Sequence, residues 1–392
     1  MSHHIQINQS YLSETLSSMV SIPSTNPQMA ADGTGETRLA QYLLEQMGQL
    51  GMEARLVEPQ PGRASALGVL RGSGGGRSLM LNGHIDTVGI EGMPGAFQPE
   101  IRDGKLYGRG AQDMKGSLAA SLAAVKALVE SGRKLKGDLW IAAVSDEEYA
   151  SLGTYSVIEV LRREKALPDG AIVTEPTELQ IAAAHRGFAW LEVHTTGRPA
   201  HGSRWWEGVD ANRMMGRVLV GIDALASELT SRSPHLQVGP PSLHTPVIQG
   251  GSEVSIYAAS CKLQIERRTV PGESDAQVQV EIQAVLDRLA QADPVFKASL
   301  KLWFSRPAFE ARPDSDLLPA LQRARGQVLG EAGQTGGVAF WTDAALLAEA
   351  GVDTLLIGPV GAGLHTPDEH VDLESCRALA EILALAAEGY CG

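Results

Sequence analysis

The chain has 392 residues, of which 43% are hydrophobic and 20% charged, and its formal net charge is −13. That length predicts two or three domains of ~100–200 residues each. The acidity argues against a nucleic-acid partner, because binding phosphates requires a clustered basic surface. No stretch approaches the roughly 18 apolar residues of a membrane span, and Met1–Val20 lacks the pattern of a signal peptide. We therefore expect a cytoplasmic protein whose three cysteines are reduced.

Short apolar runs predict buried strands, each followed by a polar loop. They are Ser78–Leu81, Asp138–Val144, Ala171–Thr174 and Thr354–Ile357. Because these runs do not alternate, they are typical of strands covered on both faces, as in an α/β sheet. Met114–Ser131 is expected to form a helix with one apolar stripe. The prediction is an α/β fold, a mixed and mostly parallel sheet with helices on both faces.

The middle of the chain has a different pattern. Its segments are alternating strands at 188–195 and 254–267 and amphipathic helices at 211–229 and 274–290. Alternating strands indicate a sheet with one exposed face, so a separate α+β sandwich is expected here. We predict a catalytic domain in two parts, residues 1–185 and 303–392, interrupted by an insert at 186–302.

Acidic and histidine residues lie directly after the predicted strands. They are His84, Asp86, Glu147, Glu148, Glu175 and His365. Sites in open α/β sheets form outside the carboxyl ends of the strands, so these side chains are expected to converge. Asp113 precedes the predicted helix at 114–131, where a lone Asp would serve as an N-cap. Each residue alone has an ordinary surface or capping role, but six at strand ends and one at a helix start indicate a site.

Two imidazoles and several carboxylates suit a divalent metal without any thiolate. A carboxylate between two metals can give one oxygen to each, and metals roughly 3.5–4 Å apart can share a water and polarise a carbonyl. Asp86 is placed to accept the second N–H of His84. Because Glu147 and Glu148 are adjacent, we expect one to bind metal and the other to take a proton from the water.

Motifs follow one another along nearly the whole chain. They are Gly83-His84-Ile85-Asp86, Gly108-Arg109-Gly110-Ala111-Gln112-Asp113-Met114-Lys115-Gly116, Asp146-Glu147-Glu148, Thr174-Glu175-Pro176-Thr177, Arg268-Thr269-Val270-Pro271-Gly272 and His365-Thr366-Pro367-Asp368-Glu369. This set resembles the M20 metallopeptidase family, which includes acetylornithine deacetylases, succinyl-diaminopimelate desuccinylases, aminoacylases, dipeptidases and carboxypeptidases.

The resemblance implies a role for each residue at the strand ends. Two zinc ions would be held by His84 and Glu175 on one side and by Glu148 and His365 on the other, with Asp113 bridging them. Cobalt or manganese are alternatives to zinc. Glu147 would be the general base, and Asp86 would orient His84. The resemblance also implies a cis peptide bond after Asp113.

The resemblance further implies that the insert is a ferredoxin-like dimerisation domain, so a homodimer is expected. His201 would reach the partner subunit's site and stabilise the oxyanion. Arg268 would hold a substrate carboxylate. Each of these two has an ordinary surface alternative. Trp205 and Trp206 stand where the family has proline or small residues, and they form either insert core or one wall of a substrate site, with packing slightly favoured.

The predicted function is that of a metal-dependent amidohydrolase acting on a small N-acyl amino acid, nearest in its motifs to acetylornithine deacetylases. A dipeptidase or carboxypeptidase of the same family is the first alternative, because the catalytic residues do not distinguish the substrates. A metal-binding protein without catalysis is a distant alternative. The presence of the complete set of ligands and of the general base argues against it.

Overall fold

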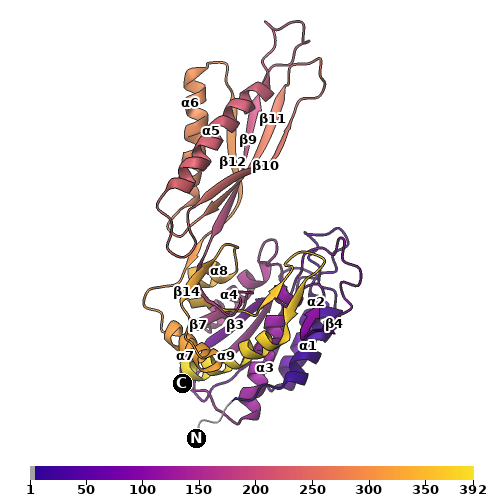
Figure 1. Cartoon of the computed structure of the whole chain (residues 1–392), viewed down its shortest axis with the longest axis vertical. Coiled ribbons are helices and arrows are strands. Elements are labelled where there is room, and N and C mark those ends of the chain that lie inside the picture. Colours follow the sequence, from indigo (N-terminus) through magenta and orange to yellow (C-terminus); the bar gives the residue numbers. More distant parts are fainter. Residues whose placement is uncertain (1–4) are drawn as a thin grey trace. The chain divides into compact units, whose positions relative to one another are not determined.

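The computed structural model describes residues 5–392, which form two compact units. The first holds the chain up to Ala183 together with Ala311–Gly336 and Thr342–Gly392. The second holds Ala184–Glu310 and Gly337–Trp341 (Figure 1). The predicted insert at 186–302 lies inside the second unit, which also takes in a short segment from later in the chain. None of the helices in residues 5–392 is long and apolar enough to cross a membrane.

The main sheet has nine strands in the order β1-β2-β6-β3-β7-β15-β8-β13, with β14 also paired to β8. Their bounds are Glu53–Val57 (β1), Ser65–Leu70 (β2), Leu79–His84 (β3), Leu139–Val144 (β6), Gly170–Val173 (β7), Ile181–His185 (β8), Phe309–Glu310 (β13), Thr335–Val338 (β14) and Asp353–Leu356 (β15). The central strands β6, β3, β7 and β15 pair in parallel, and the flanking pairs are antiparallel. The predicted mixed sheet is confirmed. Because the four central strands are parallel, their carboxyl ends share one edge.

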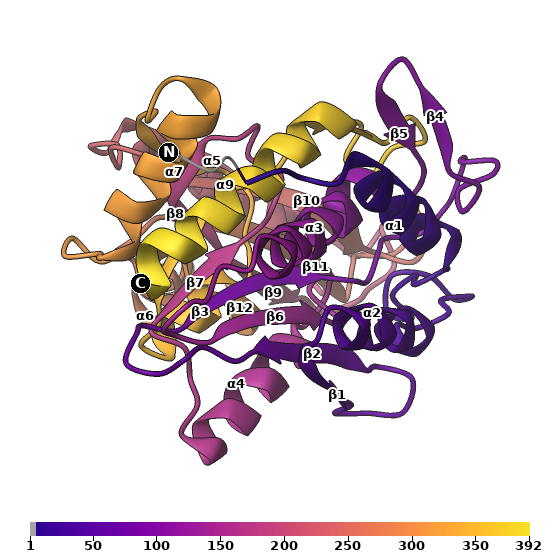
Figure 2. The ribbon, with the colours of Figure 1, turned by 90° about the horizontal axis from the view of Figure 1, so that it is seen from below.

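Helices cover both faces of this sheet, as predicted. They are α1 (Gln9–Ser21), α2 (Thr37–Gln49), α3 (Gly116–Glu130), α4 (Leu152–Glu164), α7 (Leu317–Leu329), α8 (Ala344–Glu349) and α9 (Leu373–Cys391). Figure 2 shows α3 and α9 over one face and α4 over the other. The single apolar stripe expected for α3 is wrong. This helix packs against the sheet, α1 and α9, so it is buried almost all round, and Val129 of the expected stripe is exposed.

A smaller sheet in the first unit joins segments that are far apart in the chain. Its order is β16-β17-β5-β4, formed by Glu100–Arg102 (β4), Lys105–Tyr107 (β5), Gly361–Ala362 (β16) and His370–Asp372 (β17). It pairs the segment that precedes Asp113 with the segment that surrounds His365. The small sheet therefore ties two of the predicted ligand loops to each other.

The second unit is a four-stranded antiparallel sheet, β10-β11-β9-β12, packed against two helices. The elements are β9 (Gly187–Thr196), α5 (Ala211–Ser231), β10 (Ser242–Gly250), β11 (Ser260–Thr269), α6 (Asp275–Ala292) and β12 (Ala298–Arg306). Alternate residues of β9 and β11 are buried with both helices in one core. The strand predicted at 254–267 is wrong at its start. Residues before Ser260 form a loop in which Val254 is fully exposed.

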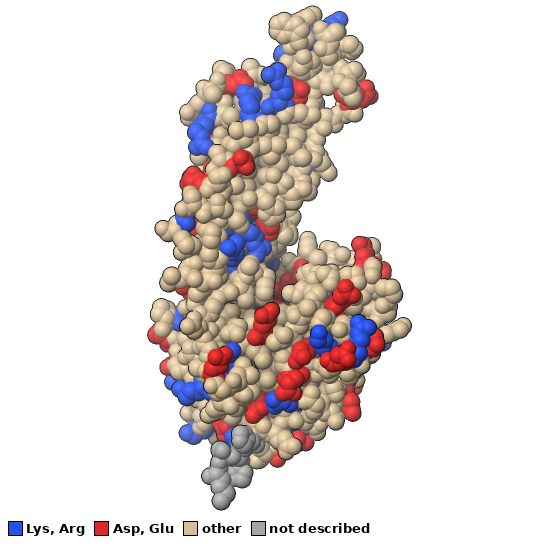
Figure 3. All heavy atoms as spheres, in the orientation of Figure 1, with Lys and Arg blue, Asp and Glu red and all other residues tan. Residues whose placement is uncertain are grey.

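On the face that Figure 3 shows, acidic and basic side chains are mixed rather than separated by sign. Figure 3 shows acidic groups across the visible face with basic groups interspersed among them. A nucleic-acid backbone requires a continuous basic stripe, because each neutralised phosphate contributes to affinity. The expectation that the chain binds no nucleic acid rests on the net charge of −13 and stays a prediction.

Two valines of α5 test how far the second unit depends on its helix–sheet core. Val218 is fully buried against that core, whereas Val220, two residues on, is 73% exposed. We expect Val218→Ala to lower the free energy of unfolding by about 1–3 kcal/mol, since two buried methyl groups are lost. Val220→Ala should change it by less than about 0.5 kcal/mol. Urea unfolding followed by circular dichroism measures both, and equal effects would contradict this packing.

Candidate metal centre

Seven predicted site residues come together at one edge of the main sheet. β3 ends at His84, and the loop after β6 carries Glu147 and Glu148. Glu175 follows β7, and His365 lies in the turn after β16. The expectation that strand ends bring these side chains together is met by the distances between them.

The carboxylate of Asp113 lies between the two histidines. Its Oδ1 is 2.9 Å from His84 Nε2, and its Oδ2 is 3.1 Å from His365 Nε2. Each oxygen therefore faces a different imidazole, which is the arrangement that a carboxylate shared by two cations requires. The peptide bond between Asp113 and Met114 is cis, as the resemblance implies.

Two further carboxylates complete the arrangement on either side. Glu148 Oε1 lies 3.3 Å from His365 Nε2, and Glu175 Oε1 lies 3.9 Å from His84 Nε2. Potential ligand atoms lie within 4.8 Å of one another in two groups that share His84, one with Glu147 and Glu175 and one with Asp113 and Glu148. Oxygen and imidazole nitrogen donors at this density fit two divalent cations.

His84 is oriented from behind by the backbone of Asp86. Its Nδ1 donates to the Asp86 carbonyl oxygen at 3.0 Å, whereas the nearest oxygen of the predicted partner, the Asp86 carboxylate, is 3.6 Å away. A carbonyl oxygen can only accept, so Nδ1 carries the proton. The lone pair of Nε2 then faces Asp113 Oδ1, and two such atoms at 2.9 Å need a proton or a metal cation between them.

The Asp86 carboxylate holds the loop that carries the two glutamates. It accepts the backbone N–H groups of Glu147 at 3.0 Å and of Glu148 at 3.2 Å, together with the Asn26 side-chain amide at 2.8 Å. Asp86 is fully buried. Its main contact is therefore with the loop, which fixes where both glutamate side chains begin.

A buried ion-pair network supports this loop one layer further back. Arg63 donates to Glu36 at 2.8 Å through both Nε and Nη2, and Nη2 also donates to Asp146 at 2.5 Å. Asn26 links Asp146 to the Asp86 carboxylate. Asn26, Glu36 and Arg63 were not among the predicted site residues, because none of them lies in a family motif or directly after one of the predicted strands.

The electrostatics of the cluster reflect crowded negative charge. Burial raises the pKa of Glu147 and of Glu175 well above the usual range, and neighbouring carboxylates add to both shifts. Burial also opposes ionisation of Asp113, but hydrogen bonds with His365 and His84 lower its pKa overall. Hydrogen bonds with Asp113 and Glu148 raise the pKa of His365 to about 10. The cluster therefore favours positive charge at its centre, which divalent cations would supply.

Glu369 holds the loop that leads into Asp113. Its Oε2 accepts from Arg109 Nη1 at 2.7 Å and from the Gly110 N–H at 3.0 Å. Its Oε1 accepts the N–H groups of Gln112 at 3.0 Å and of Asp113 at 3.2 Å. Four donors thus converge on one buried carboxylate. Glu369 ends the motif that begins at His365, but the motif alone did not predict this role for it.

His201 belongs to the second unit and lies in an exposed turn after β9. Its Nδ1 accepts the backbone N–H of Ser203 at 3.2 Å and lies 2.8 Å from the Ser203 hydroxyl. In the neutral imidazole the proton is then on Nε2, which makes Nε2 a hydrogen-bond donor. This tautomer is the one that an oxyanion-stabilising histidine needs.

Arg268 also belongs to the second unit, near the end of β11. Its Nη2 donates to the Ala339 carbonyl oxygen at 2.6 Å, and its side chain is 22% exposed. The guanidinium is therefore anchored and still reachable by solvent.

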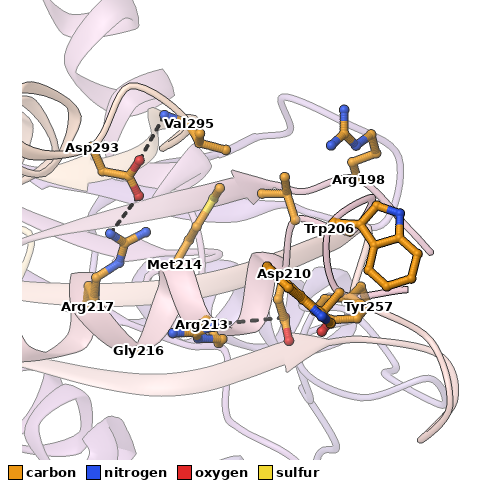
Figure 4. A pocket seen from close by; sticks show the side chains of 13 residues that line it. Arg198, Trp206, Asp210, Arg213, Met214, Gly216, Arg217, Tyr257, Asp293 and Val295 are labelled. Carbon is orange, nitrogen blue, oxygen red and sulfur yellow. Dashed lines mark hydrogen bonds and ion pairs between the residues drawn. The ribbon is translucent and has the colours of Figure 1, made fainter. Parts of the chain in front are cut away.

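The favoured packing role for Trp205 and Trp206 is wrong. Their exposed fractions are 71% and 62%, so neither belongs to the insert core. They border a cavity of about 650 Å³ beside the start of α5, lined also by Arg198, Arg213 and Tyr257 (Figure 4). None of the nine predicted site residues lines this cavity.

Comparison with known proteins identifies the family. The model of peptidase family M20/M25/M40 matches residues 80–389. An acetylornithine deacetylase of Myxococcus xanthus is 30% identical over 338 residues, which is 84% of this chain and 85% of that protein. An N-formyl-4-amino-5-aminomethyl-2-methylpyrimidine deformylase of Halalkalibacterium halodurans is 29% identical over 385 residues, covering 91% of this chain and 88% of that protein.

Solved structures share the fold at lower identity. Aminopeptidase PepT of Bacillus cereus superposes with a TM-score of 0.80 at 18% identity, covering 98% of this chain and all of that one. The YXEP protein of Bacillus subtilis, a dinuclear metal-binding peptidase of family M20, superposes with a TM-score of 0.73 at 15% identity, covering 97% of each chain. These likenesses show that the present chain shares the fold of both structures over nearly its whole length.

The hydrogen bonds of Glu369 give a test of the metal centre. We expect Glu369→Gln to weaken Zn²⁺ binding about 10- to 100-fold, because the amide NH₂ cannot accept and the Asp113 loop loses part of its support. Competition with a chromophoric chelator measures the affinity. Glu374→Gln on the exposed side of α9 is the matched control and should leave it unchanged. Unchanged affinity in a folded Glu369→Gln protein would show that Glu369 does not position the bridging carboxylate.

Proposed function

This chain belongs to peptidase family M20/M25/M40 and is a metal-dependent hydrolase of amide bonds, and we propose that it removes the acyl group from a small N-acyl amino acid. The observation that carries this proposal is Asp113 facing His84 with one oxygen and His365 with the other. The relatives at about 30% identity are named as deacetylases and a deformylase, which supports an acyl-amide substrate.

We propose zinc as the metal, with cobalt or manganese as alternatives. One ion would be held by His84 and Glu175 and the other by His365 and Glu148, with Asp113 shared between them. Bound there, the two ions would supply an acidified water and polarise the amide carbonyl. The donor set fits, because it combines imidazole nitrogen with carboxylate oxygen and places the shared carboxylate centrally.

Glu147 is proposed as the general base. Its backbone N–H is fixed by Asp86, so its side chain starts from a defined position beside His84 and Glu175. Glu147 would take a proton from the attacking water and later give it to the departing amine nitrogen. The water oxygen joins the amide carbon and the C–N bond breaks, which releases a carboxylic acid and a free amine.

We propose that the oxyanion formed during attack is stabilised by His201 of a second copy, in a homodimer formed through the second unit. The Nε2 donor implied by the Ser203 hydrogen bond supports this role. Arg268 would hold the substrate carboxylate bidentately. The three cysteines are buried and unpaired, which supports a reducing, cytoplasmic setting.

The experiment that tests the function is a hydrolysis panel of N-acetyl amino acids, N-formyl amino acids and dipeptides, run with Zn²⁺-loaded protein. We expect acyl-amino acids to be cleaved at higher kcat/KM than dipeptides, and a chelator to abolish the activity until metal is restored. Faster cleavage of dipeptides would assign the chain to the peptidase alternative. Two bound metals without any hydrolysis would favour a binding protein.

Substitution of the general base tests the mechanism. We expect Glu147→Gln to lower kcat by about 10²–10⁴-fold while the protein retains its metal, because the amide cannot accept the proton. Glu159→Gln, on an exposed part of α4, is the matched control and should keep full activity. Metal content by elemental analysis separates loss of the base from loss of the site. Full activity of Glu147→Gln would rule out this mechanism.

A further inference from the structure

The cavity bordered by Trp205 and Trp206 is built entirely from the second unit. Its lining comes from the loop after β9, the first two turns of α5, the loop before β11 and the loop between α6 and β12. Its volume of about 650 Å³ is in the range of sites for small organic molecules. None of the proposed metal ligands lines it, so its binding chemistry is set by other residues.

The loop that carries the two tryptophans has a fixed backbone. Arg198 and Val209 exchange two backbone hydrogen bonds, each 2.8 Å long, and these close the loop between them. The rings of Trp205 and Trp206 meet nearly edge to face, at 84° and with centroids 6.0 Å apart. The loop is therefore held while both rings stay exposed to solvent. Adjacent exposed tryptophans at the rim of a cavity are typical of a binding surface.

Tyr257 supplies a third aromatic ring to the cavity. Its ring packs directly on the backbone of Gly208, where an added Cβ atom would lie 2.5 Å from the ring carbon Cγ. Its backbone N–H donates to the Ala200 carbonyl oxygen at 3.0 Å. A residue with a side chain at position 208 would displace the ring, so glycine is needed there. Aromatic rings that are held in advance bind planar groups at a low entropic cost.

Gly216 leaves the helical wall of the cavity open. It lies inside α5, where glycine is less favourable than any residue except proline. Apart from its own helix backbone and chain neighbours, no atom of the described residues lies within 4 Å of the place that its Cβ would occupy. Gly221 differs, because a Cβ there would lie 2.4 Å from Val285 Cγ1 and disturb the packing of α5 on α6. Packing inside the chain therefore explains Gly221, whereas Gly216 preserves space for a ligand.

Cations outnumber carboxylates around the cavity. Asp210 caps α5 through the backbone N–H groups that follow it, and Asp293 binds Arg217 at 2.8 Å (Figure 4). Both carboxylates thus have partners. Arg198 and Arg213 are exposed, and within residues 5–392 neither guanidinium forms an ion pair. Two such cations beside aromatic rings suit an anionic ligand.

We propose that this cavity binds a small molecule that joins a planar ring system to an anionic group, such as a carboxylate, sulfonate or phosphate. The rings of Trp206 and Tyr257 would pack on the planar part of the ligand. The guanidinium groups of Arg198 and Arg213 would bind its anionic part. The inference does not depend on the proposed hydrolysis, because no proposed metal ligand lines the cavity.

Calorimetric titration of the zinc-loaded full chain with naphthalene-2-sulfonate tests the proposal. We expect a Kd below about 1 mM, which is reasonable for a ligand of this size in a preformed site. 2-Naphthalenemethanol has the same rings without the charge, and it should bind about tenfold more weakly because it forms no charge-assisted hydrogen bond. Cyclohexanesulfonate has the charge without aromatic rings and should also bind about tenfold more weakly.

Substitutions locate the binding in the cavity. Gly216→Leu should weaken binding of naphthalene-2-sulfonate at least about tenfold, because the side chain enters the cavity while leucine favours the helix. Gly48→Leu, at a glycine of α2 that also has open space around its Cβ position, is the matched control and should change nothing. Arg213→Gln should remove most of the preference for the sulfonate over the alcohol. Arg288→Gln, on an exposed part of α6, should keep that preference.

Circular dichroism and sedimentation velocity accompany each variant. Binding weaker than about 1 mM, or a Kd that both Gly216→Leu and Arg213→Gln leave unchanged, would overturn the proposal. Loss of self-association in Gly216→Leu, without naphthalene-2-sulfonate binding to the parent protein, would assign the cavity to a second copy of the chain and also overturn it. If Gly216→Leu does not fold, Trp206→Ala replaces it, since this exposed ring belongs to no core of the second unit. An unchanged Kd in Trp206→Ala would then overturn the proposal.

Discussion

Crowded negative charge at one edge of the main sheet constrains the rest of the catalytic unit. Asp113, Glu147, Glu148 and Glu175 stand close to two imidazoles, and ligand atoms lie within 4.8 Å of one another in each of two groups that share His84. Unit charges at ~4 Å repel by about 4 kcal/mol at the effective dielectric of a protein surface. Such a cluster is tolerable only when cations share it and when its loops are prevented from moving apart. The supporting hydrogen bonds behind the cluster follow from that need.

Two buried carboxylates prevent the ligand loops from moving apart, and both do so in the same way. Asp86 accepts the backbone N–H groups at the start of one ligand loop, and Glu369 accepts those that lead into Asp113. An ionised carboxylate has about four lone-pair sites and only accepts hydrogen bonds. Each of these two carboxylates can therefore accept several backbone N–H groups and hold in place a loop that has no regular secondary structure. The ligands are thereby held by residues remote in sequence. Their positions depend on the fold rather than on the loops themselves.

Sequence reasoning predicted the elements whose signal is local. The non-alternating runs before His84 and Glu147 are the buried strands β3 and β6, and their polar successors are the candidate ligands. It could not predict contacts set by tertiary packing. Arg63 and Glu36 are ordinary surface residue types until the fold buries them as a pair. Trp205 is exposed, although burial in the core was slightly favoured for it. The local sequence does not show whether two adjacent tryptophans lie beside a hydrophobic core. Val254 likewise alternates with its neighbours without being in a strand.

The metal cluster does not reveal which substrate the chain cleaves, because proteins with different named activities share this fold. Proteins named as an aminopeptidase and as a dinuclear metal peptidase superpose on this chain over almost its whole length, while relatives nearer in sequence are named as a deacetylase and a deformylase. Differences in substrate must therefore arise from residues outside the cluster that touch the parts of the ligand remote from the amide.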